Sequence, residues 1–560
     1  MFQQKRRIAL IILAVLIILL PLVLSNLITP VTAEYVTPDL NILLVNPHGS
    51  CRTVEALELD SHLHITTAQG FGNINQTLNN FDVLFILDTP FTSDSIQVID
   101  QFITNGGGLV IFTGPNMTTS PFGFKELGIT KDNNLKANTE QAISNPIDEN
   151  SPFVTNIAWN SIPETINYTV FSNSNTIAHI VVDDVDTNNA LLMTQTKGQG
   201  NIVVYAGWTT KPYNREVTLW PYFTYFVYIS VLFAANKPIP MYADWQYSPV
   251  PHTAEQLAIG LGILILSISV VSMFIIVRRK SKHPITVEAF ESKRNREEET
   301  EKERYLRDEW ERIGMHRQLG GFFYTLFLTL LLIIPYIILN SMIFPRYILP
   351  FPQAAGWYNW TSNFFLALWT LFDLGTSTAM VKYFAEYRVH QPSIAVRYVQ
   401  LFVWWQMLSG LVQLTLVAFI GSIFFSRTFL AHLTWIFVAH SIIQFPGCLL
   451  VFMYLFQAMQ RLDYYQLSSL LYYSFLTILG QYVLILFFRQ WGASNPVFGE
   501  ALGAGIGYAL GQYAGNWMAF FLTVYLFKRL GFSIKTIFRA DFTMVEVKKA
   551  LTFGGKWTTG

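Results

Sequence analysis

The sequence predicts an α-helical multi-pass membrane protein with a six-helix lobe, preceded by an exported α/β domain built on a parallel sheet. Hydrophobic residues make up 51% of its 560 residues, and charged residues only 13%, about half the share of a typical soluble domain. Long uncharged runs lie in the first 33 residues and beyond residue 256, whereas strand-like and helix-like segments alternate between them. This composition argues against a single soluble enzyme, a disordered chain and a nucleic-acid-binding protein.

Residues 1–33 have the organisation of an export signal. Lys5, Arg6 and Arg7 form a basic start, and residues 8–25 contain no charge. Val31 and Ala33 occupy the two small positions that signal peptidases prefer. The apolar run is also long enough to remain in the membrane as an anchor. Two interpretations of residues 1–33 therefore stay open, a cleaved signal peptide and an N-terminal membrane anchor. Either one places the following residues outside the cytosol.

Residues 34–256 are expected to form the exported α/β domain. This stretch carries 21 acidic and 8 basic side chains, a net charge of −13. Apolar runs predict strands at 41–46, 62–66, 82–87, 109–113, 191–194 and 201–206. Apolar spacing predicts helices at 93–104, with Ser93 as its N-cap, and at 220–235. Strands that alternate with helices favour a parallel sheet.

A family resemblance follows from the middle of this domain. It rests on a strand ending at Asp88, a helix, the run Asn105-Gly106-Gly107-Gly108, a strand ending at Thr113-Gly114, and a late strand pair around Gly198-Gln199-Gly200. In this order the segment resembles the class I glutamine-amidotransferase-like fold over most of residues 40–236.

The catalytic thiol of that family has no counterpart in this sequence. Active members carry a nucleophilic Cys on a sharp strand-to-helix turn, and here that turn reads Gly114-Pro115-Asn116-Met117. Cys51, with His48 nearby, follows the first strand instead. We therefore expect a non-catalytic domain that binds or scaffolds, and no enzyme activity.

A membrane span at 257–277 and a charged segment at 278–318 are expected next. The span ends in a basic cluster from Arg278 to Lys282, which marks a cytoplasmic edge. Pairs such as Glu298 and Lys302 lie four residues apart with the acid first, which favours a solvated cytoplasmic linker helix.

Residues 319–527 are expected to form the six-helix lobe, followed by a cytoplasmic connector and the start of a further helix at 528–560. Basic residues gather in the loops assigned to the inside, which gives a multi-pass protein of the cell membrane with residues 34–256 outside. The expected spans are 319–344, 363–385, 398–425, 430–457, 466–488 and 499–527. Four glycosylation sequons fall on the proposed outside, at Asn75, Asn116, Asn167 and Asn359.

Charged residues within the spans are the candidate substrate-binding residues. Asp373 is expected about ten residues into its helix, near the bilayer midplane, and Lys382 and Arg397 lie nearer the cytosol. The structural alternatives are an interhelical hydrogen bond for Asp373 and a side chain that reaches the headgroups for Lys382. No metal ligands or cofactor motif accompany them. Small residues every four positions predict a helix-packing face, at Gly503, Gly507, Gly511 and Gly515.

A second resemblance covers the lobe. It rests on Leu371-Phe372-Asp373-Leu374-Gly375 with Lys382 and Ala385-Glu386-Tyr387, on the run from Gln457 to Asp463, and on Leu551-Thr552-Phe553-Gly554. These segments resemble the first six-helix lobe of polysaccharide flippases, in the multidrug/oligosaccharidyl-lipid/polysaccharide exporter superfamily. Members carry a second lobe, which this sequence does not contain, so a longer chain or a partner chain is expected to supply it.

The resemblance implies a function and its partners. It implies that membrane lipid and a lipid-linked glycan are the partners, and that a lipid-linked oligosaccharide or polysaccharide precursor crosses the membrane by alternating access. Two alternatives remain open: a membrane-anchored receptor or assembly scaffold that acts through its exported domain, and a multidrug-type exporter.

Overall fold

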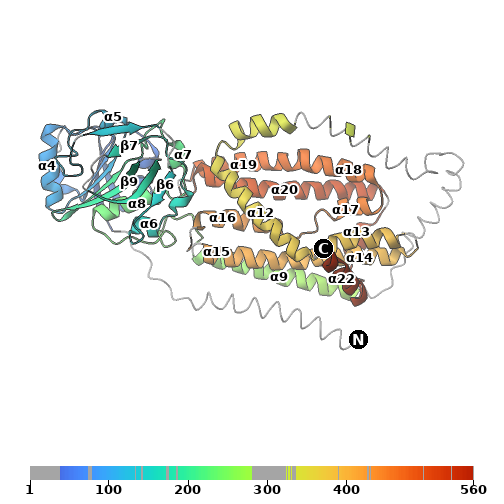
Figure 1. Cartoon of the computed structure of the whole chain (residues 1–560). Coiled ribbons are helices and arrows are strands. Elements are labelled where there is room, and N and C mark those ends of the chain that lie inside the picture. The colour runs from blue at the N-terminus through green and yellow to red at the C-terminus, as the bar shows by residue number, and fades with distance from the viewer. Residues whose placement is uncertain are drawn as a thin grey trace.

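The computed structural model describes residues 38–280 and 336–558, together with a few residues between 323 and 330. Short gaps fall at 73–77, 133, 140–142, 172–175, 185–186, 252, 389, 426–427, 429, 496 and 531. The predictions for residues 1–33 and 281–318, and most of the expected span 319–344, lie outside the described residues. An α/β domain lies at one end of a bundle of long helices (Figure 1).

The α/β domain is built on an eight-stranded sheet with the order β2-β1-β3-β4-β10-β9-β8-β6. Its first five strands are parallel, which confirms the predicted α/β domain with a parallel sheet. These strands are β1 (Leu40–Val45), β2 (Leu63–Ala68), β3 (Val83–Leu87), β4 (Gly108–Phe112) and β10 (Gly200–Tyr205). Every residue of β3 and β4 is buried, because helices cover both faces of the sheet.

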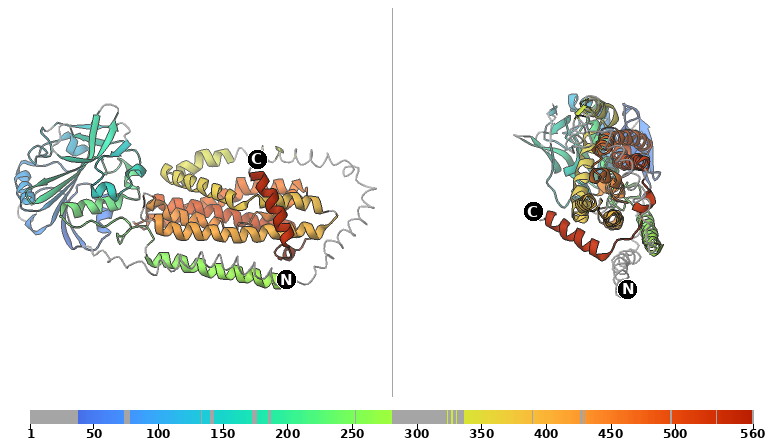
Figure 2. Two further views of the ribbon diagram at one scale, coloured as in Figure 1. Left: turned by 60° about the horizontal axis from the view of Figure 1, so that its bottom comes forward. Right: turned by 90° about the vertical axis from the view of Figure 1, so that its right-hand side faces the viewer.

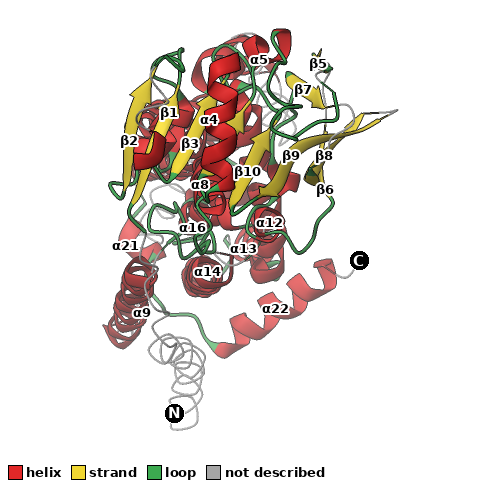
Figure 3. Cartoon of the chain, turned by 90° about the vertical axis from the view of Figure 1, so that its left-hand side faces the viewer, coloured by secondary structure: helices red, strands yellow, loops and turns green. Residues whose placement is uncertain are grey.

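Two predicted helices cover opposite faces of this sheet. Figure 3 shows α4 (Ser93–Thr104) in front of the strands and α8 (Phe223–Ala234) behind them. The predicted N-cap of α4 is wrong by one residue. Thr92, not Ser93, caps the helix, since Thr92 and Ser95 form a reciprocal capping box.

The far edge of the sheet is larger than the sequence pattern predicts. The antiparallel strands β9 (Thr187–Lys197), β8 (Ile177–Asp184) and β6 (Ile143–Pro146) extend it. A separate two-stranded sheet, β5 (Leu135–Asn138) and β7 (Tyr168–Phe171), adjoins the main sheet through a bridge between Tyr168 and Gly207, just after β10. A short helix, α2 (Arg52–Glu58), follows β1.

Three helical runs are long and apolar enough to cross a membrane, which agrees with the prediction of a membrane protein. They are Ala254–Lys280 in α9 (Thr253–Lys280), Pro392–Phe424, and Leu462–Ala493. The second run joins α14 (Pro392–Leu414), η5 (Thr415–Ile420) and α15 (Gly421–Phe424). The third joins α18 (Leu462–Leu471), η8 (Tyr472–Leu476) and α19 (Thr477–Ala493).

A bent pair of helices raises this count to four among the described residues. The pair is α12 (Pro352–Asp373) and α13 (Thr376–Tyr387), which meet at an angle of 50°. Another long helix, α20 (Gly499–Arg529), is less apolar because glycine and amide residues interrupt it. The six-helix lobe therefore stays a prediction.

Two expected spans differ from the helices observed. The span expected at 363–385 begins earlier, at Pro352, so Asp373 lies at the end of α12 rather than ten residues into a helix. The span expected at 430–457 is divided into η7 (Ala431–Leu433), α16 (Thr434–Ile443) and α17 (Val451–Ala458). Pro446 interrupts it, since proline has no N–H to continue a helix.

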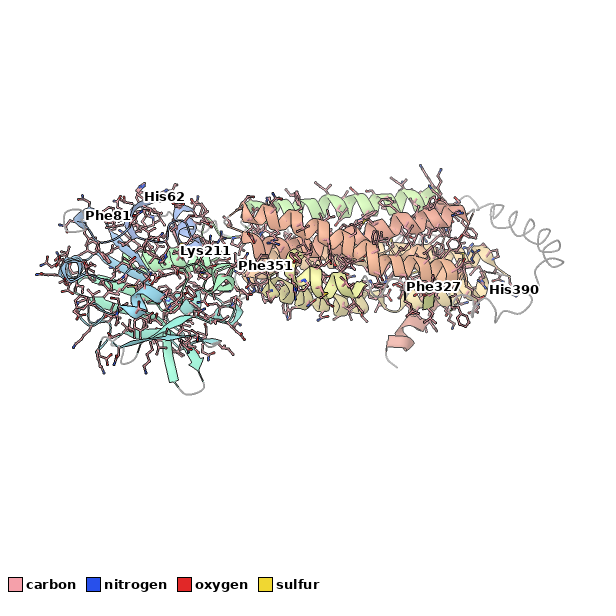
Figure 4. All side chains as sticks on the ribbon, turned by 90° about the horizontal axis from the view of Figure 1, so that it is seen from above. His62, Phe81, Lys211, Phe327, Phe351 and His390 are labelled. Carbon is pink, nitrogen blue, oxygen red and sulfur yellow. The ribbon has the colours of Figure 1, made fainter. Side chains whose placement is uncertain are left out.

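Polar and aromatic contacts join the α/β domain to the bundle. Glu500 at the start of α20 forms ion pairs with Arg215 of the α/β domain and Arg489 of α19, each at 3.7 Å. Both guanidinium groups also lie over the ring of Phe351, at 5.9 and 5.3 Å from its centroid. Figure 4 places Phe351 at this junction, which fixes one end of the bundle against the α/β domain.

The basic segments predicted to be cytoplasmic meet at the other end of the bundle. Arg278 at the end of α9 donates to the carbonyl oxygens of Ala540 and Phe542, at 3.1 and 3.2 Å. These residues lie between α21 (Ile534–Ile537) and α22 (Met544–Thr558). Figure 2 shows α22 crossing the bundle obliquely in this region, far from the α/β domain.

Candidate functional site

The backbone breaks where α12 meets α13. Leu374 and Gly375 adopt left-handed conformations, with φ of 48° and 68°, so the helix cannot continue through them. Leu374 carries a steric penalty in this conformation that glycine does not, which identifies the break as a feature held in place by its surroundings.

The Asp373 carboxylate lies at this break and is buried, with 6% of its surface exposed. It accepts Thr376 Oγ1 at 2.9 Å and Ser377 Oγ at 2.8 Å, both from the first turn of α13. Gln406 of α14 donates to it from across the interface. Among the described residues all its partners are neutral, so the site can stabilise a negative charge by hydrogen bonds but does not cancel it.

Helix α22 packs directly on the break. Gly554 lies so close to Leu374 and Gly375 that a side chain at either glycine would collide with backbone atoms. Lys382 of α13 lies with its Nζ 4.1 Å from the ring centroid of Phe553 on the same helix. Arg397 of α14 pairs with Glu546 of α22 at 3.4 Å.

The structure thus gathers two of the predicted cations around one helix, and neither of them pairs with Asp373. Lys382 is exposed, and no carboxylate lies within ion-pair distance of it in the described part of the chain. Arg397 is already paired, with 36% of its side chain exposed. Of these two cations, Lys382 is therefore the one without a described carboxylate partner.

The glycine stripe of α20 faces α19. A Cβ at Gly515 would lie 2.7 Å from the Cα of Thr477. Equivalent positions on Gly503, Gly507 and Gly511 would meet backbone atoms of Phe488, Leu484 and Gln481. Only glycine lets the two backbones approach this closely.

A polar group whose mutual contacts the sequence did not predict lies beside this stripe. It comprises Tyr472, Gln481, Gln512 and Asn516, which we call the amide cluster. Gln481 donates to Gln512 at 3.1 Å, Gln512 donates to the Tyr472 hydroxyl at 3.1 Å, and that hydroxyl donates to Asn516 at 2.6 Å. Their spacing along the sequence gave no signal, since the residues meet only when η8, α19 and α20 pack.

The carboxyl ends of β1 and β3 bring polar residues together in the α/β domain. The Asp88 carboxylate is fully buried and accepts the backbone N–H groups of Asn116 and Met117, at 2.9 and 3.2 Å. His48 Nε2 lies 3.1 Å from it. Burial raises the pKa of Asp88, against the opposing effects of these hydrogen bonds and of His48.

The thiol of Cys51 does not join this group as a nucleophile. Cys51 is buried, with 3% of its surface exposed, at the N-cap of α2. The turn after β4, where the amidotransferase thiol would lie, is closed around Asp88, because Asn116 Nδ2 also donates to that carboxylate at 3.1 Å. At this turn the structure shows hydrogen bonds to Asp88 from Asn116 and Met117.

The sequons lie in different surroundings. Asn116 is exposed but donates to Asp88, and Asn167 is half-buried, with the Thr169 of its sequon buried. Asn359 is exposed within α12, and Asn75 lies outside the described residues. Among the residues described, no group of three or more His, Cys, Asp or Glu side chains is placed to hold a metal ion.

Comparison with known proteins found no matching family model and no matching curated protein. Three solved structures share a weak likeness. Cytoplasmic protein STM3548 from Salmonella typhimurium is 14% identical, with 35% of this chain and 98% of that one covered and a TM-score of 0.28. Cytoplasmic protein STM1381 from Salmonella typhimurium LT2 is 13% identical (34% and 98% covered, TM-score 0.29). The mmIFT52 N-terminal domain is 11% identical (35% and 98%, TM-score 0.25). At these TM-scores the likeness assigns neither a fold nor a function to this chain.

Proposed function

We propose that this protein is a flippase that moves a lipid-linked oligosaccharide or polysaccharide precursor across the cell membrane by alternating access. In this proposal the α/β domain is a non-catalytic accessory domain outside the cytosol. A second six-helix lobe, from a longer chain or a partner, completes the pathway.

The broken span at Asp373 is the observation that carries this proposal. Inside a bilayer, backbone that leaves the helical ladder is tolerated only where protein buries it or where it lines a polar pathway. Transporters build their substrate and ion sites from such discontinuous helices. An inert anchor has no need of a buried carboxylate and two left-handed residues at the centre of a span.

The position of Lys382 supports a role in binding the substrate's diphosphate. A charged diphosphate cannot cross hydrocarbon unassisted, because losing its hydration is far too costly. Lys382 is exposed near the end of the bundle where the basic segments meet, and its described neighbour is an aromatic ring rather than a carboxylate. An ammonium group in these surroundings is available for a charge-assisted hydrogen bond to phosphate.

Asp373 is assigned a different role, as the group that carries a proton or cation during the transport cycle. Its buried carboxylate has only neutral partners among the described residues, so a bound cation would balance a charge that hydrogen bonds alone now stabilise. Binding and release of this cation would alter the contacts that hold α13 at its present angle to α12.

A scaffold or receptor is the second candidate, and one observation favours it. The Asp373 carboxylate also accepts the backbone N–H of Ser377 at 3.3 Å, in the first turn of α13, and a purely structural break would also need such a contact. Asp373→Asn separates the two functions, since asparagine accepts backbone N–H groups at helix starts about as well as aspartate but carries no negative charge.

The test is transport by the protein purified from its native membrane in mild detergent, so that associated subunits are retained. Reconstituted vesicles receive a lipid-linked oligosaccharide with a fluorescent headgroup, and an impermeant quencher reports its movement. We expect Lys382→Gln and Asp373→Asn each to slow transport about tenfold, the effect of losing one charge-assisted contact. Lys528→Gln, another exposed cation at the end of α20, should leave the rate within about twofold. Unchanged rates in both site variants would favour the scaffold.

A further inference from the structure

The amide cluster lies near the middle of two long helical runs, α20 and the run Leu462–Ala493, which is long and apolar enough to cross a membrane. Helix α20 has 31 residues, with Glu500 at one end and Lys528 and Arg529 at the other. At a rise of about 1.5 Å per residue, Gln512 and Asn516 lie roughly 20 Å from either end. Amides at this depth are costly unless they are hydrogen-bonded or face a polar space.

The hydrogen bonds within the cluster leave donors unused. The Asn516 side chain is held through Oδ1 alone, so its Nδ2 donates to no group of the residues that the structure describes. Asn516, Gln512 and Gln481 are only half-buried. An amide that keeps free donors at membrane depth is suited to bind a polar ligand.

The backbone next to the cluster is also irregular. The π-helical segment η8 begins at Tyr472, the residue whose hydroxyl joins Gln512 to Asn516. Single π-helical turns within longer helices are rare and occur frequently at functional sites. This irregularity is independent of the side-chain contacts and marks the same place in the fold.

An aromatic pair adjoins the amides. Tyr508, Gln512 and Asn516 are spaced by four residues and share one face of α20. Tyr508 stacks on Tyr358 of α12, with ring centroids 3.7 Å apart, so that face of its ring is covered by protein. The amides and the Tyr472 hydroxyl are the groups left to bond the hydroxyl groups of a sugar ring.

We propose that the amide cluster binds the uncharged, hydroxyl-rich sugar headgroup of a membrane lipid. All four members are neutral, which suits a sugar rather than a phosphate or an amino group. This inference rests on the proposed flippase function, and it separates the sugar site from the phosphate contact at Lys382.

The test measures equilibrium binding and not transport. The full chain in phosphatidylcholine nanodiscs is titrated with glucosyl-diacylglycerol, and native mass spectrometry counts the retained glycolipid. Asn516→Leu and Tyr472→Phe should each weaken binding about fivefold or more, the value of one hydrogen bond. Thr523→Val is the matched control on α20, since the Thr523 hydroxyl donates to the carbonyl of Ala519 in its own helix. Tyr472→Phe removes one oxygen atom and keeps the inference testable if Asn516→Leu fails to fold.

Further arms identify the ligand. Phosphatidylglycerol and unglycosylated diacylglycerol should not compete, and free methyl glucoside should bind far more weakly than the glycolipid. Equal binding of free methyl glucoside would overturn the assignment to a lipid headgroup. Unchanged glycolipid binding in both variants would overturn the site. Variants that lose oligomeric mass instead of glycolipid would also overturn it, because the cluster would then be a contact with another helix.

The two proposals fail in different ways. If the variants lose glycolipid binding but the unmodified protein transports nothing, the sugar site stands and the flippase function does not. If transport depends on Lys382 while the amide-cluster variants bind glycolipid normally, the function stands and this site does not.

Discussion

Replacing Gly515 by alanine should force α19 and α20 apart. The new Cβ would lie 2.7 Å from the Thr477 Cα, whereas ordinary contact begins at 3.4 Å, so the backbones must separate by about 0.7 Å. Rotating a side chain cannot relieve this collision, because the Cα belongs to the backbone. Overpacking of this kind costs about 1–3 kcal/mol, partly offset by the gain of about 1 kcal/mol when alanine replaces glycine in a helix.

Gly262→Ala is the matched control for this prediction. Gly262 lies in α9, and a Cβ at this position would meet no atom within 4 Å, so only the favourable helix effect remains. We expect Gly515→Ala to be less stable than Gly262→Ala by about 1–3 kcal/mol. Unfolding in bicelles by added dodecyl sulfate, followed by tryptophan fluorescence, measures the difference. Equal stabilities would refute the close helix contact.

Three further predictions concern the α/β domain. Burial lowers the pKa of His179 below 6.5, despite the opposing effect of Asp148. The stability that neutral His179 contributes is therefore present above pH 6.5 and is lost as the pH falls through its folded pKa. Hydrogen exchange of β8 and β9 should accelerate on acidification, and His179→Gln should flatten that response. Glu500→Gln should weaken the contact between the α/β domain and the bundle by no more than about 1 kcal/mol. The change should appear as a broader distribution of spin-label distances between the α/β domain and α20 at low salt. An unchanged distribution would show that the aromatic contacts hold this junction alone. Cys51 should resist maleimide until the chain unfolds, and rapid labelling of the native protein would reopen a catalytic role for this thiol.

The parallel sheet was predictable because its strands are short apolar runs bounded by turn residues. Strands β1, β3 and β4 lie within one or two residues of the expected positions. The antiparallel edge was not predictable in full. Strands β6 and β8 mix polar and apolar residues, so they depend on pairing in the sheet, β8 with β9 and β6 with β8.

The bundle shows where hydropathy patterns lose information. An apolar run predicts a span, and Gly375 after Asp373 indicates a bend in it, but hydropathy does not respond to the left-handed conformations of Leu374 and Gly375 that break the helix. The amide cluster was missed for another reason. Tyr472 and Asn516 are 44 residues apart, and only the close packing that the α20 glycines permit brings them within hydrogen-bond distance.

Movement of a headgroup-labelled lipid-linked oligosaccharide across vesicle membranes, by the unmodified protein with its native partners, tests the flippase assignment most directly. The flippase account predicts that label initially protected inside the vesicles becomes accessible to an external quencher far faster than in vesicles without protein. Equal rates with native protein, heat-unfolded protein and no protein would contradict it.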